Sequence, residues 1–148
     1  MDIERLLRLL NEHSVRYVVI GATAFPVHGY ARATLDVDIF IEPETGNAER
    51  TRTALAGFGY DVTDLTVEEL LSKKILIRQY TLQTDIHPFV KGVTFADVWG
   101  RRVTSRIGET PADFASLDDL ISMKKAAGRP KDVEDLRVLL ELKARKGR

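Results

Sequence analysis

The sequence contains no cysteine. A chain without cysteine has no disulfide framework, no thiolate ligand for zinc and no thiol nucleophile, and an intracellular setting is the simplest interpretation. The sequence also lacks any run of about 18 apolar residues, the length that a membrane-spanning helix needs. Its first five residues are Met-Asp-Ile-Glu-Arg, which is not the pattern of a signal peptide. We therefore expect a cytoplasmic protein with no membrane partner.

An excess of charge of either sign is absent as well. The 22 Lys and Arg residues balance the 22 Asp and Glu residues, so the formal net charge is zero. No global positive field would then hold nucleic acid or an anionic membrane. Hydrophobic residues make up 44% and charged residues 30% of the 148 residues, which is typical of a folded protein rather than a disordered one. The length predicts a single domain over residues 1–148.

Apolar patterns that favour strands alternate with patterns that favour helices. Residues 17–20 form a short β-branched run that stops at Gly21, and residues 35–41 alternate before becoming wholly apolar. Both patterns predict buried strands. A short helix over 21–29 is expected between them. Further strands are predicted over 75–80, 82–90 and, at a sheet edge, 99–107, and helices over 3–14, 43–56, from 66, from 116 and over 131–143.

Strands interleaved with helices predict a sheet covered by helices rather than a sandwich of two sheets. We therefore predict an α/β (α+β) fold with a mixed sheet flanked by helices. Its core would span residues 15–110, and a C-terminal helical pair would lie within 116–145. The sequence shows no internal repeat and no low-complexity linker that would divide the chain.

Three aspartates stand in strand patterns where an unpaired carboxylate is unfavourable. Asp36 and Asp38 lie two residues apart, so their side chains leave the same face of a strand with Cα atoms about 6–7 Å apart. Asp85 lies in a second apolar strand pattern. Buried acids need neutralisation, and divalent cations with oxygen ligands commonly supply it. Three acids on adjacent strands predict a site for two magnesium ions.

Such a site suits phosphoryl or nucleotidyl transfer, in which one ion activates the attacking hydroxyl and the other stabilises the leaving oxygen. Asp85 would then be the candidate base. The structural alternative is that Asp36 and Asp38 only pair with Arg32 or cap a turn. Gly21 favours catalysis, because a glycine turn that feeds a helix N-terminus presents free N–H groups to a phosphate.

The residues from Gly21 to Asp38 read G-A-x-A-x-x-x-H-G-x-x-R-x-T-x-D-x-D. This pattern resembles the signature of the polymerase-β-like nucleotidyltransferase superfamily. It is most similar to the small bacterial branch that includes nucleotidyltransferase toxins of abortive-infection systems and minimal nucleotidyltransferases. The run from Lys124 to Leu136 resembles the C-terminal motif of that branch, so that the resemblance covers residues 15–140.

The resemblance implies a role for each part of this pattern. Gly21 and Ala22 would cradle the triphosphate of the nucleotide substrate, ATP among the candidates. Asp36 and Asp38 would bind both magnesium ions, and Asp85 would complete the metal site and activate the acceptor. The family commonly has Gly-Ser or Gly-Gly where this chain has Gly21-Ala22, so only backbone donors remain at that point.

Two basic residues near the C-terminus are further candidates for nucleotide binding. Lys124 continues the apolar face of its helix, where a lysine needs a partner. It could reach a phosphate, or it could pair with Asp132 or Asp135 and fasten the last two helices. Arg129 has the same two alternatives, a contact with the nucleotide or acceptor and a salt bridge at a helix end.

The loop before the second strand supplies two more nucleotide-binding candidates. Arg32 and Thr34 could contact phosphate or order the loop through hydrogen bonds. His28 is interpreted as a structural hydrogen-bonding residue rather than a proton carrier. His87 shares a strand face with Asp85 but is not assigned to the site.

These residues predict a magnesium-dependent nucleotidyltransferase. An acceptor hydroxyl would attack the α-phosphate of a nucleoside triphosphate and release pyrophosphate. The resemblance implies a protein or transfer RNA acceptor, a toxin–antitoxin or phage-defence role and a cognate toxin or antitoxin partner. Two alternatives stay open: a non-catalytic antitoxin with a degenerate nucleotidyltransferase fold, which Ala22 favours, and nucleic-acid binding by the basic tail over residues 143–148.

Overall fold

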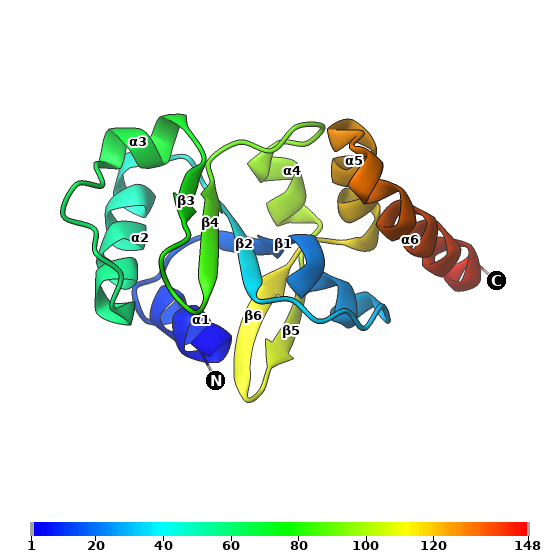
Figure 1. Cartoon of the computed structure of the whole chain (residues 1–148), viewed down its shortest axis with the longest axis horizontal. Helices are drawn as coiled ribbons and strands as arrows, with labels where there is room; N and C mark the ends of the chain where they lie inside the picture. The colour runs from blue at the N-terminus through cyan, green and yellow to red at the C-terminus, as the bar shows by residue number, and fades with distance from the viewer. Residues whose placement is uncertain (1, 148) are drawn as a thin grey trace.

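The computed structural model describes residues 2–147 and contains one mixed six-stranded sheet with the strand order β3-β4-β2-β1-β6-β5 (Figure 1). This architecture confirms the predicted α/β fold. The strands are β1 (Tyr17–Ile20), β2 (Asp36–Ile41), β3 (Ile75–Ile77), β4 (Gln83–His87), β5 (Val103–Ile107) and β6 (Thr110–Phe114). The helices are α1 (Asp2–Glu12), α2 (Thr45–Phe58), α3 (Val67–Ser72), α4 (Phe95–Gly100), α5 (Leu117–Ala127) and α6 (Val133–Lys146), with 3₁₀ helices η1 (Gly21–His28) and η2 (Pro130–Asp132).

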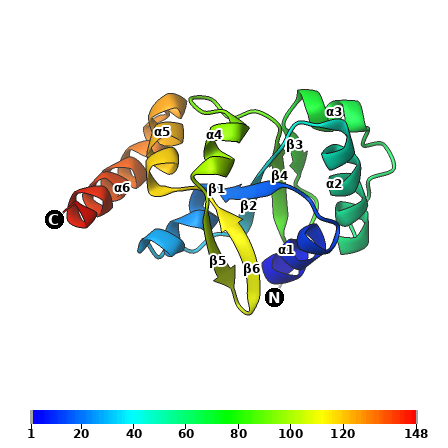
Figure 2. The same ribbon diagram turned by 180° about the vertical axis from the view of Figure 1, so that it is seen from behind.

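The sheet combines both kinds of strand pairing. Strand β1 runs antiparallel to β2 and parallel to β6, while β2 runs parallel to β4. Strands β3 and β5 are the two edges, each antiparallel to its neighbour. Helices α2 and α3 lie at one end of the molecule and α5 and α6 at the other, as both views show (Figures 1 and 2). The two central strands therefore lie between the N-terminal helices and the C-terminal helical pair.

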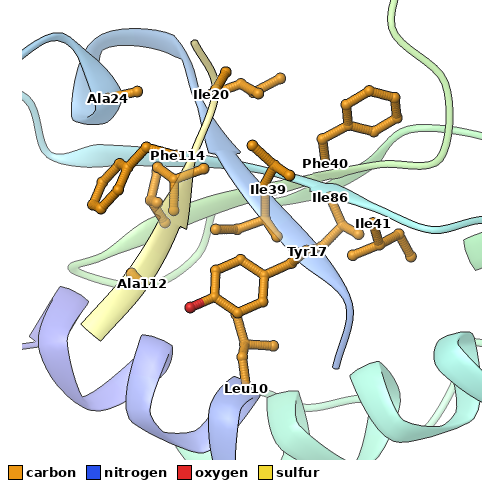
Figure 3. Close-up of a cluster of buried hydrophobic side chains, with 14 of the residues drawn as sticks. Leu10, Tyr17, Ile20, Ala24, Ile39, Phe40, Ile41, Ile86, Ala112 and Phe114 are labelled. Carbon is orange, nitrogen blue, oxygen red and sulfur yellow. The ribbon is translucent and has the colours of Figure 1, made fainter. Parts of the chain in front are cut away.

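The core forms where the apolar face of α1 meets the central strands. Leu10 of α1 and Tyr17 of β1 are buried, and Figure 3 shows the Tyr17 ring directed toward Leu10. The Tyr17 hydroxyl donates a 2.8 Å hydrogen bond to Asn11 Oδ1, so its polar end is satisfied. Complete burial of a large aliphatic side chain contributes about 1.5–3 kcal/mol, and this cluster fixes β1 and β2 against the helices.

Helix boundaries follow local capping chemistry. The Glu44 carboxylate accepts hydrogen bonds from the backbone N–H groups of Gly46 and Asn47 at the start of α2. Thr66 and Glu69 form the capping box that the sequence predicts for α3. Ser116 caps α5, which ends at Gly128 in the left-handed region.

Several elements differ from the sequence prediction. Trp99 lies in α4, capped by the Thr94 side chain, and not in the predicted edge strand, which begins at Val103. Strand β6 (Thr110–Phe114) was not predicted, because Pro111 near its start argues against a strand. The strands predicted over 75–80 and 82–90 are shorter, at Ile75–Ile77 and Gln83–His87.

The C-terminal helix is longer than expected. It continues to Lys146 rather than ending at Lys143, and the Lys143 ammonium lies 2.9 Å from Asp118 of α5. Arg148, the last residue of the predicted basic tail, lies outside the described residues. Across residues 2–147, no helix has both the length and the apolar character that crossing a membrane requires.

Candidate active site

A cleft of about 390 Å³ is lined by residues of the central sheet, of η1 and of the C-terminal helical pair. Every residue that the sequence predicts for the site lines it, although these residues are spread over more than a hundred positions of the chain. The fold thus brings the predicted carboxylates and the predicted basic residues to one place. The predicted residues are Gly21, Ala22, Arg32, Thr34, Asp36, Asp38, Asp85, Lys124 and Arg129.

The carboxylates enter the cleft from adjacent parallel strands. Asp38 of β2 is in register with Asp85 of β4, and Asp36 is in register with Gln83. Asp85 is buried and Asp36 is exposed. One ligand atom from each of Asp38, Asp85 and His87 lies within 4.8 Å of the other two. Oxygen and imidazole donors at this spacing fit a divalent cation, while Asp36 lies outside this group.

Gly21 is required by its contact with Asp38. Its φ is +69°, a conformation that favours glycine, and a Cβ atom there would lie 2.7 Å from Asp38 Oδ2. Gly21 begins η1, and the residue before it, Ile20, provides no side-chain cap. Within residues 2–147 the first N–H groups of η1 therefore have no side-chain cap, and Gly21 and Ala22 both line the cleft.

Arg78 and Lys74 neutralise Asp85, and His87 contacts Asp38. Arg78 binds Asp85 in a bidentate manner, with Nε 3.0 Å from Oδ1 and Nη2 2.8 Å from Oδ2. Lys74 lies 3.9 Å from the same carboxylate. His87 Nε2 lies 2.8 Å from Asp38 Oδ1. These contacts make a charged cluster on one sheet face, which we call the acidic wall: Asp36, Asp38, Asp85 and His87.

Lys74, Arg78 and His87 line the cleft but were not predicted to belong to the site. Lys74 and Arg78 stand immediately before and after β3, which pairs with β4. The register of the strands places these two positions beside Asp85, and a local sequence pattern does not contain that register. The two-residue spacing from Asp85 to His87 places both on one strand face, and this was the available signal for His87.

The C-terminal helices contribute a second ionic cluster, in which cations outnumber acids. Asp132 and Asp135 are 3% and 5% exposed. Lys124 Nζ lies 3.0 Å from Asp132 and 3.5 Å from Asp135. Arg129 Nε lies 2.7 Å from Asp132, and Arg32 Nη1 lies 2.8 Å from Asp135. We call the three cations, Lys124, Arg129 and Arg32, the basic wall.

These contacts show the ion pairs that the sequence offered as one alternative for Lys124 and Arg129. Lys124 pairs with both Asp132 and Asp135 and so links α5 to α6, and Arg129 forms the salt bridge at the helix end. Both side chains nevertheless line the cleft. Hydrogen bonds from Arg129, then from Lys124, lower the pKa of Asp132 to about 2.

The loop between η1 and β2 is held by its own side chains. The Thr34 hydroxyl accepts a 3.1 Å hydrogen bond from the Asp36 N–H, so Thr34 orders this turn. The Thr23 hydroxyl donates to the Asp36 carbonyl at 2.9 Å. His28 is buried with Nε2 2.8 Å from the Ala115 carbonyl, and burial lowers its pKa. A buried imidazole tied to the backbone fits the structural role predicted for His28.

A comparison with known protein families places the chain in one of them. Residues 1–140 match the family described as nucleotidyltransferase of unknown function (DUF6036). This match spans most of the 148 residues, so the chain is a member of that nucleotidyltransferase family. No curated protein matches the chain. This match confirms the broader class, a nucleotidyltransferase, to which the resemblance of the Gly21-to-Asp38 pattern pointed.

Proposed function

We propose that the chain transfers a nucleoside monophosphate from a nucleoside triphosphate, ATP among the candidates, to an acceptor hydroxyl. The observation that carries this proposal is the register of Asp38 with Asp85 on parallel strands, in a cleft that six lysine and arginine side chains also line. A divalent cation and a polyphosphate need ligands of opposite charge within a few ångströms of each other. The acidic wall and the basic wall supply both sets.

Asp38 and Asp85 are the proposed metal ligands, with Asp36 completing a site for two Mg²⁺ ions. His87 is a further ligand candidate, because its ring nitrogen belongs to the same close group. When bound, such ions lower the pKa of an attacking hydroxyl and stabilise the charge on the leaving oxygen. The hydrogen bond with His87 would fix the orientation of the Asp38 carboxylate at the proposed metal site.

The remaining predicted residues would hold the phosphates. The backbone N–H groups of Gly21 and Ala22 are proposed donors to the triphosphate, and Thr34 holds the adjoining turn. The acceptor oxygen attacks the α-phosphorus, the bond from phosphorus to the bridging oxygen of the β-phosphate breaks, and pyrophosphate leaves with that electron pair. Asp85 is the proposed acceptor of the hydroxyl proton, which requires Arg78 to move from at least one carboxylate oxygen.

The identity of the acceptor belongs to the same proposal. The resemblance favours a protein or transfer RNA acceptor and a place in a toxin–antitoxin or phage-defence system, with a cognate partner. The expectation of a protein that acts in the cytoplasm is part of this proposal. Incubation with labelled nucleotide and either cell lysate or transfer RNA, followed by separation of protein from RNA, would identify the acceptor class.

A non-catalytic antitoxin is the second candidate function. The bidentate contact of Arg78 with Asp85 favours it, because that contact occupies both oxygens of the proposed base. Ala22 favours it as well, because it offers no hydroxyl to the phosphates. The two functions differ in one measurable property, since a contact-only antitoxin does not require a triphosphate.

Calorimetric titration with each of the common nucleoside triphosphates, with and without magnesium, tests the proposal. We expect magnesium-dependent binding to the wild type, followed by release of pyrophosphate once an acceptor is present. Asp38→Asn should abolish both. Absence of binding by any triphosphate would overturn the proposed transferase and favour the antitoxin.

A further inference from the structure

The basic wall owes its arrangement to two buried acids. Asp132 and Asp135 bring together cations from three separate parts of the chain: Arg32 from the loop after η1, Lys124 from α5, and Arg129 from the connection to η2. The Tyr30 hydroxyl donates a further hydrogen bond, 3.0 Å, to Asp135 Oδ1. Every oxygen of the two carboxylates is thus paired among the described residues.

The burial of these groups is layered. The side chains of Asp132 and Asp135 are 4% and 6% exposed, whereas those of Arg32 and Arg129 are 43% and 51% exposed. The Lys124 side chain is intermediate, at 16%. The acids therefore lie behind the two arginines and share the more buried layer with the lysine ammonium.

The three cations have N–H donors that the two carboxylates do not use. An arginine has five N–H donors and a lysine has three. Within residues 2–147, Arg32 gives one donor to Asp135, and Arg129 gives two to Asp132. Lys124 directs its ammonium at two carboxylates and retains one N–H. Three positive charges also exceed two negative ones, so the cluster can still attract an anion.

We propose that Asp132 and Asp135 are positioning residues for the phosphate end of the nucleotide, acting through Lys124, Arg129 and Arg32. This inference rests on the proposed nucleotidyl transfer. Long basic side chains lose considerable conformational entropy when they bind a ligand, and prior fixation reduces that cost. The two acids provide this fixation before the nucleotide arrives, and Asp135 also anchors the loop that carries Arg32 to α6.

Positioning and simple charge balance make opposite predictions. Asp135→Asn removes a negative charge from the cleft, so electrostatic attraction alone would tighten the binding of a polyphosphate. If the acids served only to hold the helices together, removal of one acid would free its cations. Triphosphate binding would then tighten or stay the same. If Asp135 positions the cations, binding weakens although the cleft has become more positive.

The experiment compares Asp135→Asn with a matched buried ion pair elsewhere. Asp119 is 2% exposed, lies on α5 and is held by Arg101 at 2.8 Å, but does not line the cleft. Asp119→Asn therefore controls for the loss of a buried carboxylate. ATP, GTP, CTP and UTP, and the monophosphate of whichever binds, are titrated with magnesium into each protein, and thermal unfolding is recorded.

We expect Asp135→Asn to weaken triphosphate binding at least about tenfold, the size of one lost charge-assisted hydrogen-bonded contact. Monophosphate binding should change less, and Asp119→Asn should leave triphosphate binding unchanged. Equal or tighter triphosphate binding by Asp135→Asn would overturn the positioning role while leaving the transferase proposal intact. Absence of triphosphate binding by the wild type would overturn the transferase, and the positioning role with it.

Tyr30→Phe provides a second test that is independent of the folding of Asp135→Asn. It removes the hydroxyl that holds Asp135 without changing any charge. We expect triphosphate binding to weaken about two- to fivefold, since one neutral donor to a carboxylate is lost. The double variant Arg32→Gln/Asp135→Asn should bind little worse than Asp135→Asn alone. Full additivity of the two substitutions, or no effect of Tyr30→Phe, would contradict the proposal.

Discussion

The two walls of the cleft contain the same kind of ion pair but differ in their balance of charge. In the acidic wall, carboxylates on the sheet face the cleft and Arg78 reaches Asp85 from beside the edge strand β3. In the basic wall, Asp132 and Asp135 are buried and half-exposed arginines lie over them. Asp85 is likewise buried beneath the half-exposed Arg78, so burial does not distinguish the walls. Asp36 and Asp38 have no arginine or lysine partner among residues 2–147, whereas three cations pair with the two acids of the other cluster. The sheet therefore offers carboxylates to a cation, and the helices offer a surplus of positive charge to an anion.

The largest effect is expected from neutralising a carboxylate of the acidic wall. Asp38→Asn should reduce nucleotide transfer by about a thousandfold or more, because loss of a metal ligand removes several kcal/mol of transition-state stabilisation. Labelled-nucleotide transfer measures this loss. Thermal unfolding should change little, because Asp38 is not fully buried.

Asp113→Asn serves as the control for that substitution. Asp113 is also a strand aspartate, 3.5 Å from Arg102, but it does not line the cleft. Its replacement should leave transfer unchanged. Equal turnover of Asp38→Asn and wild type would contradict the role of the acidic wall.

Acid unfolding tests the burial of the basic wall's acids. The pKa of Asp132 lies at about 2, below its ordinary value of 3.8. A lowered folded-state pKa stabilises the fold above the ordinary value, and this contribution is lost as pH falls from about 4 to about 2. The shift corresponds to roughly 2 kcal/mol. Urea unfolding free energies of the wild type should therefore fall more steeply over this window than those of Asp132→Asn.

Asp118→Asn is the matched control for the acid window. Asp118 pairs with Lys143 at 2.9 Å, but its side chain is 65% exposed. An exposed pair contributes little, so this variant should retain the steep acid dependence of the wild type. If the unfolding free energy of Asp132→Asn fell with pH as steeply as that of the wild type, the buried acid would not stabilise the basic wall.

A substitution of His87 tests whether its ring nitrogen binds the metal. Asparagine can retain a hydrogen bond to Asp38 but provides no imidazole nitrogen, a ligand that suits transition metals better than magnesium. His87→Asn should weaken Mn²⁺ binding about tenfold and Mg²⁺ binding less, as calorimetry would show. His13→Asn, outside the cleft, is the control. Equal weakening for both metals would indicate that His87 only orients Asp38.

The smallest expected effect concerns Ala22, which lines the cleft between the two walls. Ala22→Ser supplies the hydroxyl that the resembled family commonly has. One added neutral hydrogen bond should tighten triphosphate binding about two- to fivefold, with stability unchanged in thermal unfolding. Ala22→Val, which adds bulk without a donor, is the control. Equal affinity of serine and alanine at this position would place the phosphates away from η1.

Local sequence patterns predicted the elements that local chemistry determines. The β-branched run of β1 and the Thr66–Glu69 capping box are confirmed, because each depends on neighbouring residues. Strand β6 was missed because Pro111 lies near its start, where pairing with β5 is still possible. Trp99 was assigned to a strand although the Thr94 cap begins a helix there.

The sequence predicted nine of the residues that line the cleft but neither their pairing nor the presence of Lys74, Arg78 and His87. Periodicity places Asp36 and Asp38 on one strand face, and the family pattern points to Gly21 and Lys124. The contacts of Asp38 with His87 and of Arg32 with Asp135 join positions 49 and 103 residues apart. Such pairs are set by strand register and helix packing, which a local pattern does not contain.

The central claim is that the acidic wall binds a metal–nucleotide complex. It is tested most directly by calorimetric titration of each nucleoside triphosphate, with and without magnesium, into the wild type and the double variant Asp36→Ala/Asp38→Ala. We expect the wild type to bind a nucleoside triphosphate only when magnesium is present, and the double variant not to bind it. Binding that is absent from the wild type, or that is equal in both proteins and independent of magnesium, would contradict the central claim.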